Sequence, residues 1–168
     1  MTDVLLIRHA IAEDRARARE AGIPDADRAL TRTGKQRMTA AAEGLRRLVG
    51  HLSVVGTSPL RRAVQTARIV AAAFDDAPVI EVPALAPGGS VLDVAAWIAR
   101  QEHGAVALVG HEPDMGLWTG WALAGASRPV VRFRKGGVCC LRFDGVPEAG
   151  AAMLQWSLAP AHLRRIGA

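Results

Sequence analysis

Short apolar runs and helical segments alternate along this chain, and this alternation most limits the folds open to it. The runs expected to form strands fall at 4–7, 52–57, 78–82 and 105–110. Helices are predicted between or after them, over 30–50 with Thr31 as the N-cap, from Ser58-Pro59 to about Phe74, from Ser90, and from near Pro113. Such alternation is typical of a largely parallel sheet covered by helices on both faces.

The rest of the chain completes this prediction. Strand-like segments at Val138–Phe143 and Met153–Leu158 lie close together and predict an antiparallel edge, whereas the charge-rich stretch from Arg8 to Asp27 is expected to be a loop. With 168 residues, 50% hydrophobic and 22% charged, the chain has the size of one globular domain, which we place at 1–168. The expected fold class is α/β, a three-layer sandwich with a mostly parallel central sheet.

Charge and cysteine usage limit the partners and the compartment. The formal charge is +5, but Lys35 and Lys135 are the only lysines and the arginines form no basic run, which argues against nucleic acid. The arginine bias fits an anionic ligand, although genome composition explains it equally well. Cys139 and Cys140 are adjacent on a predicted strand and point to opposite faces, so neither a disulfide nor a metal site is expected. We therefore predict a cytoplasmic protein, and the absence of a signal peptide or a long apolar run predicts no membrane association.

Polar side chains follow three of the predicted strands. Arg8 and His9 follow the first strand, Arg61 and Arg62 begin the helix after the second, and His111 follows the fourth. Because the carboxyl ends of parallel strands meet at one edge of a sheet, these groups are expected to converge there. A helical projection places Arg62 toward the ligand and Arg61 toward solvent.

Histidines, arginines and helix N-termini together favour a phosphoryl group as the ligand. A histidine can attack phosphorus and form a phosphohistidine intermediate, which divides one difficult transfer into two easier ones. The arginines would neutralise the phosphoryl oxygens, and a second histidine would donate a hydrogen bond to them.

Four segments resemble the motifs of the histidine phosphatase superfamily, which has the phosphoglycerate mutase-like fold. They are LIRHA, RALTRTG, SPLRRAVQT and VGHEPDM, in that order, over about two-thirds of the chain. Ala10 replaces the glycine that usually follows the first histidine, as in the short bacterial branch that includes the phosphohistidine phosphatase SixA and lacks helical cap insertions. The resemblance implies that His9 is the nucleophile and that Arg8, Arg62 and His111 bind the phosphoryl group.

One departure from the family pattern bears on the substrate. Many of the superfamily's phosphomonoesterases have an acidic residue after the third strand that protonates the leaving oxygen, but no carboxylate lies between Glu81 and Asp93 here. Imidazole, with a pKa near 6.5, can leave once its ring is protonated, whereas an alkoxide needs a proton donor. We therefore expect a phosphohistidine substrate unless Glu13, Asp14 or Glu112 folds into the donor's place.

Alternatives remain at this stage. A metal site is the main rival in enzyme chemistry, built on His9, Glu13, Asp14, His111 and Glu112, although HEPD lacks the second histidine of a metalloprotease helix. Without a Walker loop or GxGxxG motif, no nucleotide cofactor is expected. The remaining histidines, His51, His103 and His162, are interpreted as surface or structural residues. Met115, Trp118 and Trp121 are interpreted as core residues, with a substrate-facing tryptophan as the alternative.

The predicted function is that of a metal-independent phosphatase acting on protein phosphohistidine in a signalling or phosphorelay system. A small-molecule phosphomonoesterase of the same superfamily is the first alternative, and a non-catalytic phosphate-binding module is the second. The sequence names neither the physiological substrate nor the oligomeric state.

Overall fold

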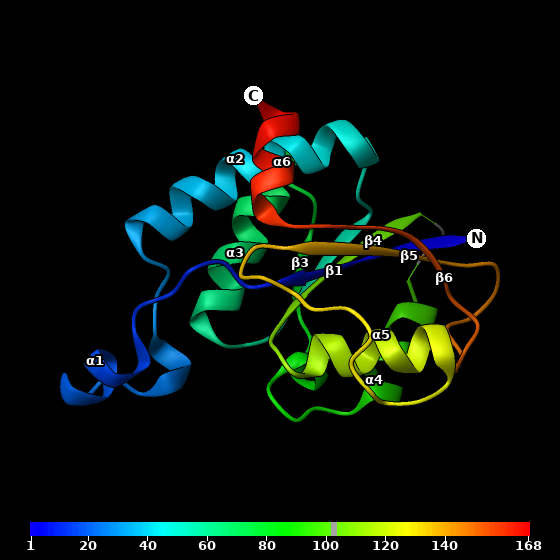
Figure 1. Cartoon of the computed structure of the whole chain (residues 1–168), viewed down its shortest axis with the longest axis horizontal. Helices are drawn as coiled ribbons and strands as arrows, with labels where there is room; N and C mark the ends of the chain where they lie inside the picture. Colours follow the sequence, from blue (N-terminus) through cyan, green and yellow to red (C-terminus); the bar gives the residue numbers. More distant parts are fainter. Residues whose placement is uncertain (102–103) are drawn as a thin grey trace.

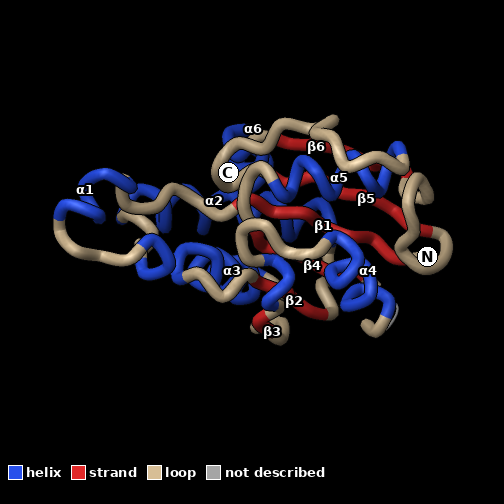
Figure 2. Tube along the Cα trace, turned by 90° about the horizontal axis from the view of Figure 1, so that it is seen from below, coloured by secondary structure: helices blue, strands red, loops and turns tan. Residues whose placement is uncertain are grey.

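The computed structural model describes residues 1–101 and 104–168, and a six-stranded sheet forms the centre of this described part (Figure 1, Figure 2). Its strands are β1 (Thr2–Arg8), β2 (Val54–Thr57), β3 (Val79–Glu81), β4 (Ala105–Gly110), β5 (Val138–Phe143) and β6 (Met153–Leu158). They lie in the order β3-β2-β4-β1-β5-β6. The strands β1 to β4 run in one direction, while β5 is antiparallel to β1 and β6 is antiparallel to β5. The predicted sheet and its antiparallel edge are confirmed.

Helices cover both faces of this sheet. They are α1 (Arg15–Glu20), α2 (Arg32–Val49), α3 (Arg61–Ala73), α4 (Val91–Ala99), α5 (Asp114–Ala124) and α6 (Pro160–Gly167), with single 3-10 turns η1 (Asp25–Asp27) and η2 (Pro83–Leu85). In Figure 1, α2 and α6 lie above the sheet, and α4 and α5 lie below it. The α3 helix packs against α2 and shares a core with it. The expected three-layer α/β sandwich in its compact form is therefore confirmed.

The central strand β1 shows why the first apolar run is continuous. Alternate side chains of Val4–Ile7 enter two different cores, one between the sheet and α2, α3 and α6, and the other between the sheet and α4 and α5. All four side chains are fully buried. The same alternation separates the two free thiols, because Cys140 lies in the first core and Cys139 in the second. The predicted placement of the cysteines on opposite faces is confirmed.

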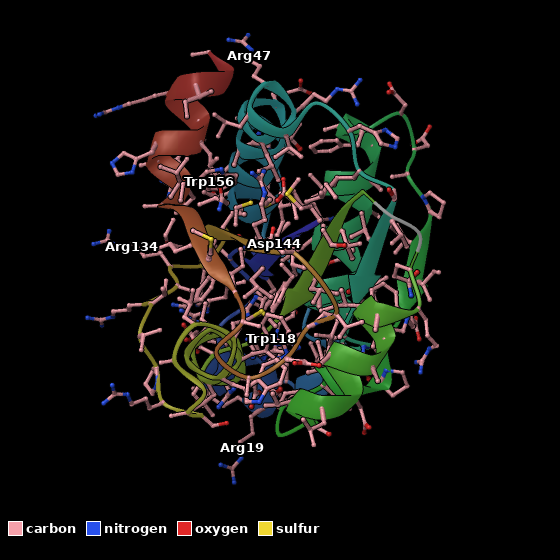
Figure 3. The ribbon with its side chains drawn as sticks, turned by 90° about the vertical axis from the view of Figure 1, so that its right-hand side faces the viewer. Arg19, Arg47, Trp118, Arg134, Asp144 and Trp156 are labelled. Carbon is pink, nitrogen blue, oxygen red and sulfur yellow. The ribbon has the colours of Figure 1, made fainter. Side chains whose placement is uncertain are left out.

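The α5 helix supplies large side chains to the second core. Met115, Trp118 and Trp121 are all buried, as the sequence predicted. The ring centroids of Trp118 and Trp121 lie 5.6 Å apart, and Trp118 also packs edge-on against Phe143. In Figure 3, Trp118 lies within the body of the molecule, whereas Arg47 extends from its surface.

The stretch from Arg8 to Asp27 was predicted to be a loop, and this prediction is wrong. It contains α1 and η1, which project beyond the carboxyl end of β1 (Figure 1). The Asp14 side chain caps α1 by accepting hydrogen bonds from the N–H groups of Ala16 and Arg17. Because Ala18 is the only buried residue of this six-residue helix, the sequence carries no apolar period that would have revealed it.

Two further helix boundaries differ from the sequence prediction. The α3 helix begins at Arg61 with Leu60 as its N-cap, not at Ser58-Pro59. The Ser58 hydroxyl oxygen accepts a hydrogen bond from the N–H of Leu60 and also contacts Nε2 of His111. The C-terminal α6 was not predicted; it packs on α2 and buries Leu163 completely. The prediction for His103 lies outside the described residues.

None of the helices in the described ranges is long and apolar enough to cross a membrane. The assignment of 1–168 to a single domain stays a prediction.

Candidate active site

The carboxyl ends of the parallel strands bring the predicted site residues together. Arg8 at the end of β1 pairs in register with Gly110 at the end of β4, so His9 and His111 follow neighbouring strands. Their ring centroids lie 5.1 Å apart. With Arg62 from the first turn of α3, these side chains line one open cleft of about 710 Å³. All four residues that the sequence singled out therefore share a single cavity.

The hydrogen bond at His9 determines which ring nitrogen carries the proton. The Nδ1 atom lies 2.7 Å from the carbonyl oxygen of Ala10, which can only accept a hydrogen bond, so Nδ1 carries the hydrogen. Burial lowers the pKa of His9 to about 3 against the effect of this bond, and the charges of Arg62 and Arg8 act in the same direction as burial. The ring is therefore neutral at physiological pH, and its Nε2 has a free lone pair.

The second histidine is held by a serine hydroxyl. The Nε2 atom of His111 lies 2.8 Å from Oγ of Ser58, and its Nδ1 is buried with no hydrogen-bond partner among the described residues. Burial, followed by the positive charge of Arg62, lowers the pKa of His111 to about 4. A buried ring nitrogen without a partner is costly, and an oxygen atom of a ligand would offset that cost.

Arg62 is buried and Arg61 is exposed, as the helical projection predicted. The Arg62 guanidinium donates to the backbone oxygen of Asp25 at 2.7 Å and to its carboxylate at 3.1 Å. That carboxylate also pairs with Arg28 and Arg15. Partial burial raises the pKa of Asp25, but the three guanidinium groups outweigh it and hold this pKa below its usual range. Asp25 is thus an ionised anchor that fixes the direction of Arg62.

Arg8 is oriented by the loop that precedes β5. Its guanidinium donates to the carbonyl oxygen of Phe133 at 2.8 Å. From the same loop, the N–H of Gly136 donates hydrogen bonds to the carbonyl oxygens of Arg8 and His9 at 3.0 and 3.2 Å. Gly136 has a φ of +79°, a left-handed conformation that glycine adopts without strain.

Thr66 joins the two halves of the site. Its hydroxyl donates to the carbonyl oxygen of Arg62 at 2.7 Å and accepts from the N–H of Ala10 at 3.1 Å. The same Ala10 residue holds the His9 ring through its carbonyl oxygen. One fully buried side chain therefore links the backbone beside His9 to the first turn of α3.

The carboxylates that line the cleft are engaged in hydrogen bonds. Glu112 accepts from the N–H groups of Phe133 and Gly116, and Glu13 accepts from the N–H of Ala29. The remaining two are the helix cap Asp14 and the arginine-bound Asp25 described above. The pKa of Asp14 and that of Asp25 are both lowered, so these two carboxylates are poor proton donors.

Sequence reasoning missed four residues that shape this site, namely Asp25, Arg28, Ser58 and Thr66. The spacing of Asp25 and Arg28 by three residues was the available signal for a salt bridge, but it lay in a stretch expected to be a loop. Ser58 was assigned to a helix cap. The described part of the chain contains no group of three or more His, Cys, Asp or Glu side chains placed to hold a metal ion.

Comparison with known proteins agrees with this geometry. The model of the histidine phosphatase superfamily (branch 1) matches residues 4–86. An uncharacterized protein of Picosynechococcus sp. is 38% identical over 156 residues, which cover 91% of this chain and 88% of that protein.

Solved structures resemble the chain over nearly its whole length. The protein histidine phosphatase SixA complexed with tungstate is 25% identical with a TM-score of 0.79, covering 96% of this chain and 99% of that one. A candidate phosphohistidine phosphatase SixA from Nakamurella multipartitia is 29% identical with a TM-score of 0.74, covering 95% and 96%. A phosphoglycerate mutase from Plasmodium falciparum shares the fold at 18% identity and a TM-score of 0.65, covering 92% and 89%. The chain therefore belongs to the histidine phosphatase superfamily and to its compact SixA-type branch.

Proposed function

We propose that this protein is a phosphatase that needs no metal ion, that uses His9 as its nucleophile, and that hydrolyses phosphohistidine on a partner protein. Family membership supports the phosphatase activity, and the SixA relatives support the phosphohistidine substrate. The roles of Arg8, Arg62 and His111 as phosphoryl ligands are part of the same proposal.

The observation that carries this proposal is the tautomer and the protonation state of the His9 ring. Its Nδ1–H donates to Ala10 and its pKa is about 3, so the ring needs no external base to become a nucleophile. The free Nε2 faces a cleft that also contains the Arg8 and Arg62 guanidinium groups. Cations beside the attacked phosphorus neutralise the oxygens that carry charge in the transition state.

The proposed reaction has two displacements at phosphorus. In the first, Nε2 of His9 forms a bond to phosphorus while the bond from phosphorus to the substrate's imidazole nitrogen breaks, and the protonated ring leaves as neutral imidazole. In the second, water attacks the phosphorus of phospho-His9, the P–N bond breaks, and inorganic phosphate and free His9 are released.

The carboxylates of the cleft favour a phosphoramidate over a phosphate ester. Glu112, Glu13, Asp14 and Asp25 are each held by backbone N–H groups or by arginine. An alkoxide leaving group requires a strong proton donor, whereas the leaving imidazole has a pKa near 6.5 and takes its proton from solvent before it departs.

The test is hydrolysis of a histidine-phosphorylated phosphotransfer domain in EDTA by the wild type, by His9→Ala and by the matched control His51→Ala. We expect wild-type and His51→Ala rates to agree, since His51 is exposed and lies outside the cleft. We expect the His9→Ala rate to fall by about 10³-fold or more because the nucleophile is lost. A base-stable, acid-labile phosphoenzyme should accumulate only in proteins that retain His9.

Full activity of His9→Ala would overturn the mechanism. Loss of wild-type activity in EDTA would overturn metal independence. Faster turnover of small phosphate esters than of the phosphotransfer domain would replace the substrate assignment by that of a small-molecule phosphatase, while leaving His9 as the nucleophile. Phosphate binding without any turnover would instead indicate a non-catalytic module.

A further inference from the structure

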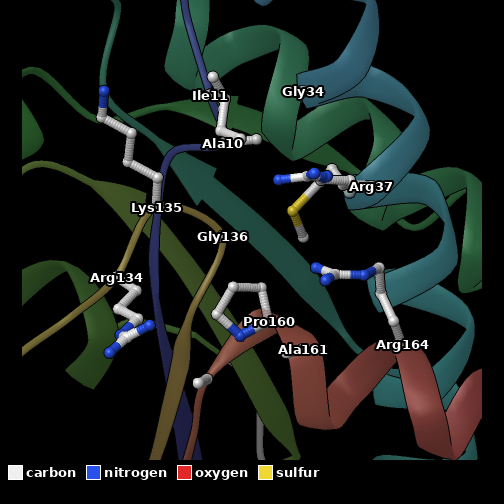
Figure 4. A pocket seen from close by; sticks show the side chains of 12 residues that line it. Ala10, Ile11, Gly34, Arg37, Arg134, Lys135, Gly136, Pro160, Ala161 and Arg164 are labelled. Atoms are coloured by element: carbon white, nitrogen blue, oxygen red, sulfur yellow. The ribbon is translucent and has the colours of Figure 1, made fainter.

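A second, smaller pocket of about 180 Å³ lies beside the catalytic cleft. Its walls come from three parts of the chain, namely the segment after β1 with the start of α2, the loop before β5, and the start of α6. The lining residues are Ala10, Ile11, Gly34, Arg37, Met38, Arg134, Lys135, Gly136, Ala159, Pro160, Ala161 and Arg164. In Figure 4, Arg37 and Arg164 extend toward the pocket from the two helices, and Arg134 and Lys135 come from the loop on its other side.

The charge of this pocket is of one sign. Arg37, Arg134, Lys135 and Arg164 line it together with no acidic residue. Within the described residues, none of the four forms an ion pair, whereas other arginines of the chain are paired, such as Arg142 with Asp3. Four cations around one pocket without a counter-charge produce a local positive potential that attracts an anionic partner.

The start of α6 adds to this potential. Its N-cap, Ala159, has no side chain that accepts a hydrogen bond, and Pro160 has no N–H of its own. The partial positive charge of the helix N-terminus is therefore left uncompensated by the chain at the pocket wall.

The pocket is joined to the catalytic cleft through the nucleophile's own backbone. Ala10, which follows His9 and holds its ring, lines the pocket. Gly136 lines it as well and donates to the carbonyl oxygens of Arg8 and His9. Lys135 lines both cavities. A ligand whose phosphoryl group enters the cleft thus has its neighbouring groups beside Lys135 and at the border of this pocket.

We infer that this pocket docks an acidic segment of the phosphorylated protein, so that carboxylates near the phosphohistidine pair with Arg37, Arg164 and their neighbours. The inference rests on the proposed function and specifies its substrate as a phosphohistidine in acidic surroundings. A protein segment fits better than one small anion because the cations are spread over two helices and a loop. Arg37, Arg134 and Lys135 are also exposed, which suits contact with a large partner.

The experiment uses two phosphohistidine peptides that differ only in glutamates flanking the phosphohistidine, which are replaced by glutamines in the second. For the wild type we expect kcat/KM to be about fivefold higher on the glutamate peptide at low salt, from two exposed ion pairs. High salt should remove this preference, because exposed charges are screened.

A matched pair of double variants locates the effect. Arg37→Gln with Arg164→Gln should lose the preference for the glutamate peptide. The control, Arg32→Gln with Arg165→Gln, removes the same charge from the same two helices, but neither residue lines the pocket, so it should keep the preference. Equal melting temperatures of the two double variants would show that both are folded.

The outcomes separate the two proposals. Hydrolysis of both peptides by the wild type with equal kcat/KM would overturn the docking inference and leave the phosphatase standing. A preference that both double variants lose equally would also overturn it, since the effect would come from net charge. Failure of the wild type to hydrolyse either peptide would refute the proposed function and the docking inference with it.

Discussion

Replacement of Thr66 by valine tests whether one buried hydroxyl positions the nucleophile. Thr66 is fully buried in α3, and its hydroxyl joins the N–H of Ala10 to the carbonyl oxygen of Arg62. Valine has almost the same shape and removes only the hydrogen-bonding group. The carbonyl of Arg62 keeps its helical hydrogen bond from residue 66, but the buried N–H of Ala10 loses its partner.

The expected loss of stability follows from the unpaired N–H of Ala10. Leaving a buried donor without a partner costs about 1–3 kcal/mol in the free energy of unfolding. With a urea m-value of about 1–3 kcal/mol/M for a chain of this size, the unfolding midpoint should fall by about 1 M. Ala10 also holds Nδ1 of His9, so its displacement would misplace the attacking nitrogen and lower kcat by about tenfold.

Thr66→Ser is the matched control, because it keeps the hydroxyl and loses a methyl group. It should be destabilised by about 1 kcal/mol through lost apolar contact, yet retain kcat within about threefold. Urea unfolding and phosphoramidate hydrolysis measure the two quantities separately. The reasoning is refuted if Thr66→Val keeps both the wild-type midpoint and the wild-type kcat, or if Thr66→Ser loses as much kcat as the valine variant.

Two further predictions concern groups that burial keeps uncharged. In the unfolded chain histidines take up protons near pH 6.5, whereas burial lowers the pKa of His9 to about 3 and that of His111 to about 4. The free energy of unfolding should therefore be highest above about pH 6.5 and fall toward pH 4. Urea unfolding of His111→Gln at several pH values should show a shallower fall of this free energy with decreasing pH. The same dependence on pH as in the wild type would contradict this. Burial also raises the pKa of the Cys139 and Cys140 thiols to about 12. Iodoacetamide at mildly alkaline pH should therefore label neither thiol in the folded protein and both thiols in urea. Labelling of the folded protein would argue against this packing.

The sequence predicted most of the sheet because the strands are covered on both faces. A strand buried on both sides must be apolar throughout, and the runs that became β1 and β4 stand out for that reason. The α1 helix was missed because its stability comes from the Asp14 cap rather than from an apolar period. The α6 helix was missed because a short segment reveals its packing against α2 only in three dimensions.

By itself, the sequence determined that Arg8, His9, Arg62 and His111 would meet. Each follows a buried strand or begins the next helix, and parallel strands bring those positions to one edge. Their assignment as catalytic groups stays a prediction.

Only the tertiary structure decided how these groups are held and charged. The tautomer of His9, the anchoring of Arg62 by Asp25 and the occupied carboxylates of the cleft depend on contacts between residues far apart in the chain. The pocket of unpaired cations beside Ala10 also depends on residues far apart in the chain, because α2, α6 and the loop before β5 meet only on folding. Strand periodicity fixes where a side chain emerges, but its protonation and partners depend on the distances that packing sets.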